Sequence, residues 1–167
     1  MKQKGFTLIE LVVVIVILGI LAVTALPRFV NLQGEARAST LQGMKAALEG
    51  AATLTYSKAA IQGKDRAATG TVNLVGGGTP VNTAYGYPRA TVADLQIVLE
   101  TTFGTASASP NDWWASATTG TPPTVVIRPK GFAAPTTPSD SNDCSVTYTQ
   151  VTATGVRPTL RVWSGGC

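Results

Sequence analysis

One carboxylate, Glu10, stands in an otherwise uncharged and largely apolar run of 21 residues, Phe6–Leu26. A charged side chain at the centre of a lipid bilayer costs at least about 2.5–3.5 kcal/mol, so an acid in such a segment requires a partner. Leaving one member of a buried ion pair alone costs several kcal/mol. The chemistry indicated at Glu10 is therefore ion pairing in an apolar environment.

The apolar run is long enough to cross a membrane as a helix. At a rise of 1.5 Å per residue, its residues span about 31 Å, which matches a hydrocarbon core of about 30 Å. The β-branched residues Val12–Ile17 favour a strand by propensity, but a segment in lipid must satisfy its own backbone hydrogen bonds and is therefore helical. Because Lys2 and Lys4 precede the run, we expect the N-terminus to stay in the cytoplasm.

A small residue, Gly5, precedes the apolar run, whereas an ordinary secretory signal has its small residues and cleavage site after the run. Cleavage between Gly5 and Phe6 would remove a charged leader, residues 1–5, and leave the apolar helix on the mature chain. An uncleaved signal anchor is the alternative, but it gives no reason for Glu10.

Pro27 directly follows the apolar run and predicts a bend or a melted segment near Gly19–Pro27, because proline removes one helical hydrogen bond. Beyond it the pattern becomes amphipathic, with helical spacing between the positions of one face. These positions are Leu41, Met44, Leu48, Ala51 and Thr55. We therefore expect one long helix over residues 6–60, with residues 6–26 in the membrane and the second half under a head domain.

Residues 61–167 are expected to form this head. Residues 61–90 are predicted to be mostly irregular, with a short strand at Thr71–Val75, and a helix is predicted from Thr91 to Phe103 with Asp94 completing a capping box. Alternating segments between prolines predict an antiparallel sheet on the long helix, hence an α+β fold. The predicted strands are Thr124–Arg128, Ser145–Val151 and Thr159–Trp163, with a weaker one at Asp112–Ala115.

The two cysteines, Cys144 and Cys167, bound the C-terminal segment 144–167. With an export signal upstream, this pair predicts a disulfide. Closing a loop of this length contributes roughly 3–3.5 kcal/mol on the loop-entropy model. Two free, buried thiols are the alternative.

The composition argues against catalysis, a cofactor or a nucleic-acid site. The chain has no histidine, which removes the commonest general base and zinc ligand, and its 13 basic residues are spread singly. We interpret Asp112, Asp140 and Asp143 as solvated loop acids. Calcium at Asp140–Cys144 is an alternative, although this stretch lacks the glycine and distal glutamate of an EF-hand loop.

Trp113 and Trp114 form the most conspicuous aromatic pair of the chain. We expect one of them to fill the core against the sheet and the other to face a subunit contact or a ligand. A sugar-binding platform is the alternative.

The segment KGFTLIE, with the LVVVIVILGILAVTALP that follows, resembles the class III signal and N-terminal helix of type IV pilins and type II secretion pseudopilins. The resemblance covers residues 2 to about 30. It implies cleavage between Gly5 and Phe6 by a prepilin peptidase, N-methylation of Phe6, a role of Glu10 in assembly, and the pilin α/β-roll. We expect Glu10 of an incoming subunit to pair with the Phe6 amine of a neighbour, and a contact within one chain is a compatible alternative.

Three further segments resemble pilins of the mannose-sensitive haemagglutinin type, namely Pro27–Arg37, Ser39–Leu54 and Gly86–Pro88. This narrower resemblance implies a major pilin of a thin type IVa filament of Gram-negative bacteria, used in surface attachment and biofilm formation. Its name suggests a sugar, but no residue here can be assigned to a surface or glycan ligand.

The resemblance implies a homopolymer that is handled by the prepilin peptidase and the pilus assembly machinery. The precursor would lie in the inner membrane and the mature subunit in an extracellular pilus. A pseudopilin of a type II secretion system is the first alternative, which the cysteine pair disfavours. A monomeric, membrane-tethered binding protein is the second, and it predicts tolerance of Glu10 replacement.

Overall fold

The computed structural model describes residues 5–74, 76, 78–105, 110–132 and 141–167, without the side chains of residues 25–31. The chain divides into two compact units, Met1–Ala36 and Arg37–Cys167. The long helix α1, Leu8–Ile61, contributes to both. Its bounds agree with the predicted helix to within two residues.

In the second unit, α1 presents one buried stripe to the head, with spacings typical of a helix face. This stripe consists of Leu41, Leu48, Ala52, Thr55 and Ala59. Three of the five predicted face positions are fully buried, while Met44 and Ala51 are half-buried. Thr55 is buried without cost because its hydroxyl donates to the Ala51 carbonyl at 2.8 Å.

Residues 61–90 are mostly irregular, as predicted, and the strand predicted at Thr71–Val75 overlaps β1. The small antiparallel sheet to which β1 belongs, in the order β1-β2-β3, was not predicted. A two-residue turn at Tyr85 and Gly86 joins β2 to β3, and both residues have positive φ, 48° and 82°. Two-residue turns with positive φ at both residues are typical of β-hairpins, so the Tyr85–Gly86 pair could have predicted this hairpin. It was missed because it follows a longer glycine-rich stretch that indicates irregular structure. The strands are β1 (Gly70–Val72), β2 (Val81–Ala84) and β3 (Tyr87–Pro88).

Helix α2, Val92–Leu99, starts with the predicted capping box. The Thr91 hydroxyl accepts from the Asp94 amide at 3.1 Å and donates to the Asp94 carboxylate at 2.6 Å. Asp94 is buried, and its other oxygen accepts from the amide and the side chain of Asn82. This carboxylate therefore joins α2 to strand β2, and α2 ends four residues before the predicted Phe103.

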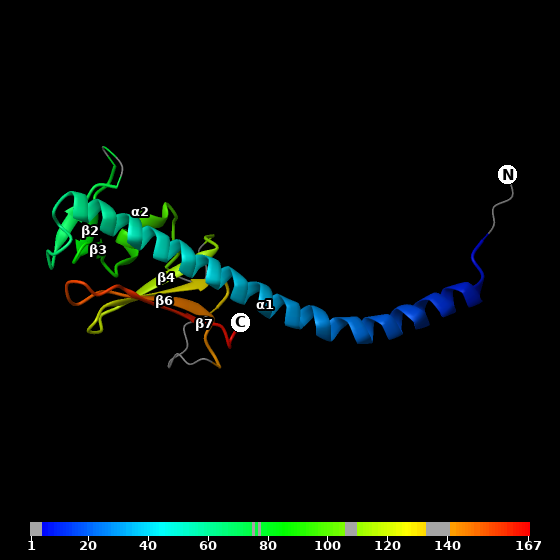
Figure 1. Ribbon diagram of the computed structural model, residues 1–167. Coiled ribbons are helices and arrows are strands. Elements are labelled where there is room, and N and C mark those ends of the chain that lie inside the picture. Colours follow the sequence, from blue (N-terminus) through cyan, green and yellow to red (C-terminus); the bar gives the residue numbers. More distant parts are fainter. Residues whose placement is uncertain (1–4, 75, 77, 106–109, 133–140) are drawn as a thin grey trace. The chain divides into compact units, whose positions relative to one another are not determined.

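Four strands form the main antiparallel sheet, in the order β4-β5-β6-β7, and the core lies between this sheet and α1 (Figure 1). The α+β fold is as predicted. Val125, Ile127, Val146 and Tyr148 fill the core from the two central strands. The strands are β4 (Trp113–Thr118), β5 (Thr124–Pro129), β6 (Ser145–Thr149) and β7 (Thr159–Trp163).

The predicted disulfide between Cys144 and Cys167 is present, with 4.9 Å between the two Cα atoms. The hairpin of β6 and β7 brings these cysteines together, since Ser145 pairs with Trp163. Gly166 then crosses against Asn142 so closely that a Cβ at this position would lie 2.5 Å from the Asn142 carbonyl carbon.

We predict that Gly86→Ala destabilises the head by at least about 2 kcal/mol. A methyl group there would lie 2.9 Å from the Asp65 Cα atom and from a Tyr56 ring atom, and φ is positive. Thermal unfolding of the full chain in detergent measures the effect. Gly43→Ala is the control, because nothing lies within 4 Å of its Cβ position and alanine should stabilise this helix by about 0.5–1 kcal/mol.

The buried Tyr148 hydroxyl donates to the Pro88 carbonyl at 2.8 Å and so joins the two sheets. Burial, followed by the nearby Tyr87 and Asp94, raises the pKa of this hydroxyl above its usual value of 10.0. Above about pH 10 the unfolded chain therefore releases a proton that the folded chain retains, so the free energy of unfolding falls as the pH rises.

We predict that Tyr148→Phe costs about 1–2 kcal/mol at neutral pH, because the Pro88 carbonyl loses its donor. The same change should flatten the loss of stability above pH 10. Denaturant unfolding between pH 7 and 11.5 measures both effects. The control is Tyr85→Phe, at a half-buried turn residue, and an equal change in both variants would contradict the role of Tyr148.

Candidate functional site

The residue singled out by the sequence, Glu10, lies in the first turn of α1 and helps to start it. Thr7 precedes the helix, and its hydroxyl accepts from the Glu10 amide at 3.3 Å. The Glu10 carboxylate reaches back and accepts from the Thr7 amide at 2.8 Å. Together they form a capping box, which the sequence analysis missed although TLIE has the required Thr-x-x-Glu spacing.

The capping box engages only one of the two carboxylate oxygens of Glu10, so the other can accept a further hydrogen bond. The Thr7 hydroxyl also donates to the carboxylate at 2.8 Å, and both of the donors from Thr7 reach the same oxygen, Oε2. Within the described residues, Oε1 accepts no hydrogen bond and Glu10 forms no ion pair. Thr7 therefore orients the carboxylate at the start of the helix while one oxygen can still receive a cationic donor.

The surroundings of Glu10 are apolar and exposed. Phe6, Ile9, Val13 and Val14 line a shallow hollow of about 380 Å³ with it. Fourteen large apolar side chains between Phe6 and Val23 are exposed, from 42% at Val12 to 92% at Phe6. Soluble monomers rarely expose a continuous apolar surface of this kind, so it marks contact with lipid or with other protein.

The predicted cleavage site lies outside regular structure. Gly5, Phe6 and Thr7 are exposed and non-helical, and the helix begins at Leu8. Exposed, irregular backbone is the usual substrate of proteolysis, so the Gly5–Phe6 bond is suitably placed. The rest of the predicted leader, residues 1–4, lies outside the described part of the chain.

Both residues of the predicted bend, Gly19 and Pro27, lie within α1. The Thr24 hydroxyl donates to the carbonyls of Ile20 at 3.4 Å and Leu21 at 3.0 Å, a pattern that satisfies the hydroxyl and often bends a helix. The bend at Gly19 and Pro27 stays a prediction.

Among the residues whose placement is described, no helix meets the length and apolarity required for a membrane crossing. The predicted span, residues 6–26, includes residues 25 and 26, whose side chains are outside that set, and the span stays a prediction.

The interpretation of Asp143 as a solvated loop acid is wrong, because its side chain is only 1% exposed and pairs with buried Arg128 at 3.3 Å. Its second oxygen accepts from the Ser145 hydroxyl at 2.9 Å. With both oxygens engaged, Asp143 is a poor calcium ligand. In the described part of the chain, no group of three or more acidic, cysteine or histidine side chains could hold a metal. Asp112 is an exposed loop residue, and Asp140 lies outside the described residues.

The tryptophan pair is split between the two faces of the sheet, as successive strand residues must be. Trp113 packs against the core, as expected for one member of the pair. Trp114 lies on the opposite face, across from Arg128. Its assignment to a subunit contact or a ligand stays a prediction.

Comparisons with known proteins agree with the resemblance at the N-terminus. The prokaryotic N-terminal methylation motif matches residues 1–26. The type IV narrow pilus major component PilA5 of Thermus thermophilus is 47% identical over 64 residues, which cover 38% of this chain and 52% of the relative. The fimbrial protein EcpC of Eikenella corrodens is 40% identical over 75 residues, which cover 45% of this chain and 49% of the relative.

A fimbrial protein of Pseudomonas aeruginosa is 34% identical over 94 residues, which cover 55% of this chain and 53% of the relative. The chain thus spans about half the length of the curated relatives it matches. No solved structure matches it significantly. The chain carries the prokaryotic N-terminal methylation motif and is similar in sequence to type IV pilus and fimbrial proteins.

Proposed function

We propose that this chain is a structural subunit of a type IV pilus, cleaved and N-methylated at Phe6 and then polymerised into an extracellular filament. The observation that carries the proposal is the exposed apolar surface of Phe6–Val23, in which Glu10 is the one carboxylate. The methylation motif over residues 1–26 and the similarity to pilus and fimbrial proteins support it.

The apolar surface of Phe6–Val23 determines where the helix can lie before and after assembly of the filament. Each of its large side chains is worth about 1.5–3 kcal/mol when removed from water, so the total is tens of kcal/mol. The helix must therefore lie in the inner membrane before assembly and among the helices of other copies afterwards. Both environments cover the apolar side chains to a similar extent, so they do not by themselves drive assembly. An assembly machinery and a polar contact must bias the transfer.

Glu10 supplies this polar contact. Cleavage after Gly5 creates a charged α-amine on Phe6, close to the membrane face. Thr7 holds one oxygen of the Glu10 carboxylate, so the other oxygen can accept from the Phe6 amine of a neighbouring copy. A subunit that docks in the correct register satisfies both charges, whereas one in a wrong register leaves them buried and alone.

The first prediction from this function concerns processing. Mass spectrometry of filaments sheared from the producing cells should find a mature N-terminus at Phe6 carrying one methyl group. Replacing Gly5 by a large residue, Gly5→Leu, should block cleavage and leave the precursor in the membrane, because the small residue lies next to the cleaved bond. The control is Gly34→Ala, a small-residue change in α1 far from that bond. A mature chain that begins at Met1 would contradict the proposal.

The second prediction concerns Glu10. Glu10→Gln should be cleaved normally but should reduce filaments at least about hundredfold, because a broken buried pair costs about 3–5 kcal/mol. Immunoblots of the mature subunit and electron microscopy of sheared filaments separate processing from assembly. Glu35→Gln is the matched control, since Glu35 is an exposed acid of the same helix outside the apolar run. Abundant filaments from Glu10→Gln would refute the pairing.

Attachment to surfaces and biofilm formation follow as the role of such a filament, and the mannose-sensitive haemagglutinin type stays a prediction. The named relatives are filament components, which favours a structural subunit over an enzyme and a pilus over a secretion pseudopilus. Filaments seen on the surface of producing cells would exclude the membrane-tethered monomer.

A further inference from the structure

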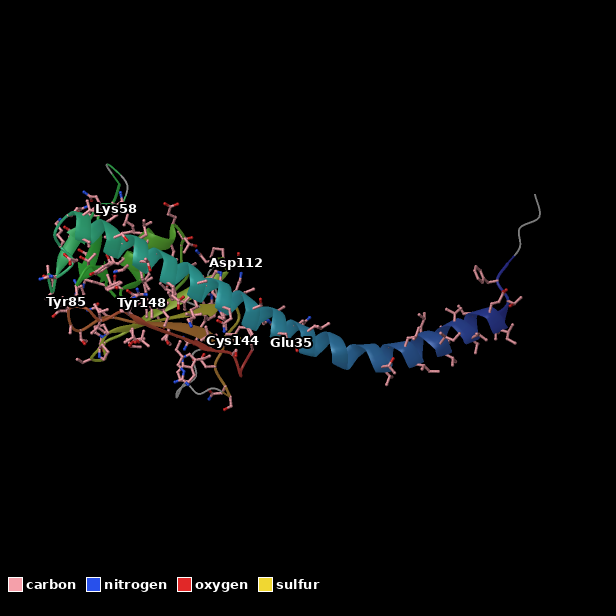
Figure 2. The ribbon with its side chains drawn as sticks, viewed as in Figure 1. Glu35, Lys58, Tyr85, Asp112, Cys144 and Tyr148 are labelled. Carbon is pink, nitrogen blue, oxygen red and sulfur yellow. A yellow bond between two sulfur atoms is a disulfide. The ribbon has the colours of Figure 1, made fainter. Side chains whose placement is uncertain are left out.

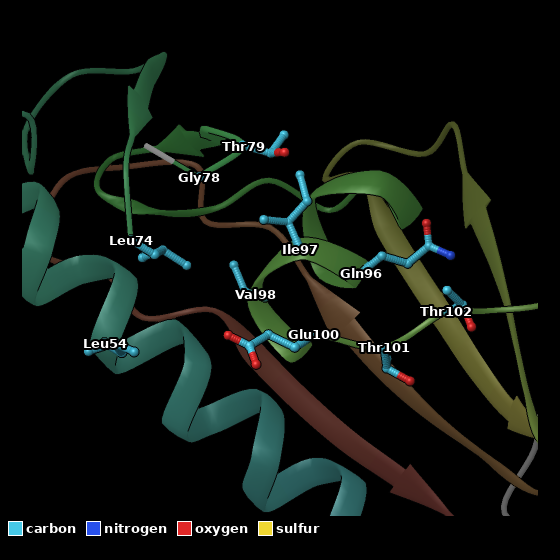
Figure 3. A pocket seen from close by; sticks show the side chains of 10 residues that line it. All are labelled: Leu54, Leu74, Gly78, Thr79, Gln96, Ile97, Val98, Glu100, Thr101 and Thr102. Carbon is cyan, nitrogen blue, oxygen red and sulfur yellow. The ribbon is translucent and has the colours of Figure 1, made fainter. Parts of the chain in front are cut away.

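In the unit Arg37–Cys167, a hollow of about 600 Å³ opens beside α1, at the end of α2 (Figure 3). Leu54 of α1 and Ile97 and Val98 of α2 form its apolar wall. Leu54 is 54% exposed, although Ala52 and Thr55 of the same helix are buried. The apolar wall of this hollow is therefore left uncovered by the described part of this unit, and threonine and glutamine side chains also line the hollow.

The hollow carries one charge, Glu100. This residue caps α2 in the left-handed conformation, and its amide donates to the carbonyls of Gln96 and Ile97, so its backbone is held in place. Its carboxylate points toward α1 in the close-up view (Figure 3). Glu100 is exposed and forms no ion pair with any described residue. An apolar wall with a carboxylate at its edge fits a small apolar group that stands next to a cation.

The turn between β6 and β7 offers this combination. Three large apolar side chains are exposed in the described residues after Arg37, namely Leu54, Ile61 and Val156. Of these, only Val156 has a charged residue next to it in the sequence, Arg157. The turn lies at the end of the sheet away from the disulfide, where it is accessible (Figure 1).

Arg157 of the same copy lies at a different hollow. It lines a space of about 880 Å³ together with Tyr87, Leu160 and residues of α1 that include Glu49. Leu54 borders both hollows and so marks the ridge between them. Arg157 also forms no ion pair among the described residues. The turn of one copy is therefore suited to the Glu100 hollow of another copy.

We propose that the Val156–Arg157 turn of one copy docks in the Glu100 hollow of a second copy, with Val156 against Leu54 and Ile97 and Arg157 paired with Glu100. This inference rests on the proposed function, because it assigns a contact between heads within the filament. Turn and hollow are different surfaces, so the contact is head-to-tail. Contacts of this kind repeat from copy to copy, and they generate a helical filament where the rotation between copies does not close a ring.

The two parts of the contact have different roles. Burial of Val156 in the apolar hollow supplies attraction, whereas an exposed ion pair contributes little by itself. Two like charges at the same place are strongly unfavourable, so the pair selects the correct partner surface. Charge reversal is therefore the most sensitive test.

The test is a charge exchange in the full chain, expressed in the cells that make the filament. Glu100→Arg and Arg157→Glu should each reduce filaments at least about tenfold, and the double variant should restore them to within about twofold of the original. Lys130→Glu is the matched control. Lys130 is exposed and follows β5 at the end of the sheet opposite the Val156–Arg157 turn, so its charge should not affect the proposed contact. Cell-associated mature subunit with an intact disulfide shows that each variant folds.

A photoreactive amino acid in place of Val156 provides a second readout. In filaments mixed from isotopically heavy and light copies, it should cross-link to Leu54 or to residues 97–101 of the other copy. Normal filaments from both single variants, a double variant no better than the worse single one, or cross-links to another region would overturn the proposal. Absence of filaments from the unaltered chain would instead contradict the proposed function.

Discussion

The structure depends on one constraint, the apolar surface that the first half of α1 leaves uncovered. Large side chains from Phe6 to Val23 are exposed, so this segment is stable only in lipid or against other chains. The unit Arg37–Cys167 has its own core between α1 and the sheet and does not need such a cover. The chain thus combines a head with its own core and a helix that requires an apolar environment.

The capping box at Thr7 and Glu10 connects local helix stability to the contact between copies. The same carboxylate that satisfies the Thr7 amide is the one charge of the apolar surface. Thr7 fixes its orientation through two bonds to Oε2, so that less conformational entropy would be lost in the proposed pairing of the other oxygen with a neighbouring amine. The start of the helix and the proposed assembly contact therefore depend on the same side chain.

The head is held together by buried polar contacts as well as by its apolar core. Two of the buried residues, Tyr148 and Cys144, are labelled in Figure 2. Asp94 joins α2 to β2, Tyr148 joins the two sheets, and the Arg128–Asp143 pair lies beside the disulfide. Each of these groups has a hydrogen-bond partner, as most buried polar groups do. They connect elements that lie far apart in the sequence.

The long helix, the Thr91–Asp94 cap, the main strands and the disulfide could be predicted from the sequence, because each depends on local spacing or on the one other cysteine of the chain. The small sheet of β1–β3 could not, because its strands of two to four residues are too short to show a period. The interpretation of Asp143 as a solvated acid was wrong for a related reason. Its burial depends on pairing with Arg128, which lies 15 residues away in the sequence. Such pairings and the two hollows beside Leu54 follow from the folded structure alone, because they are formed by residues that chain folding brings together from distant segments.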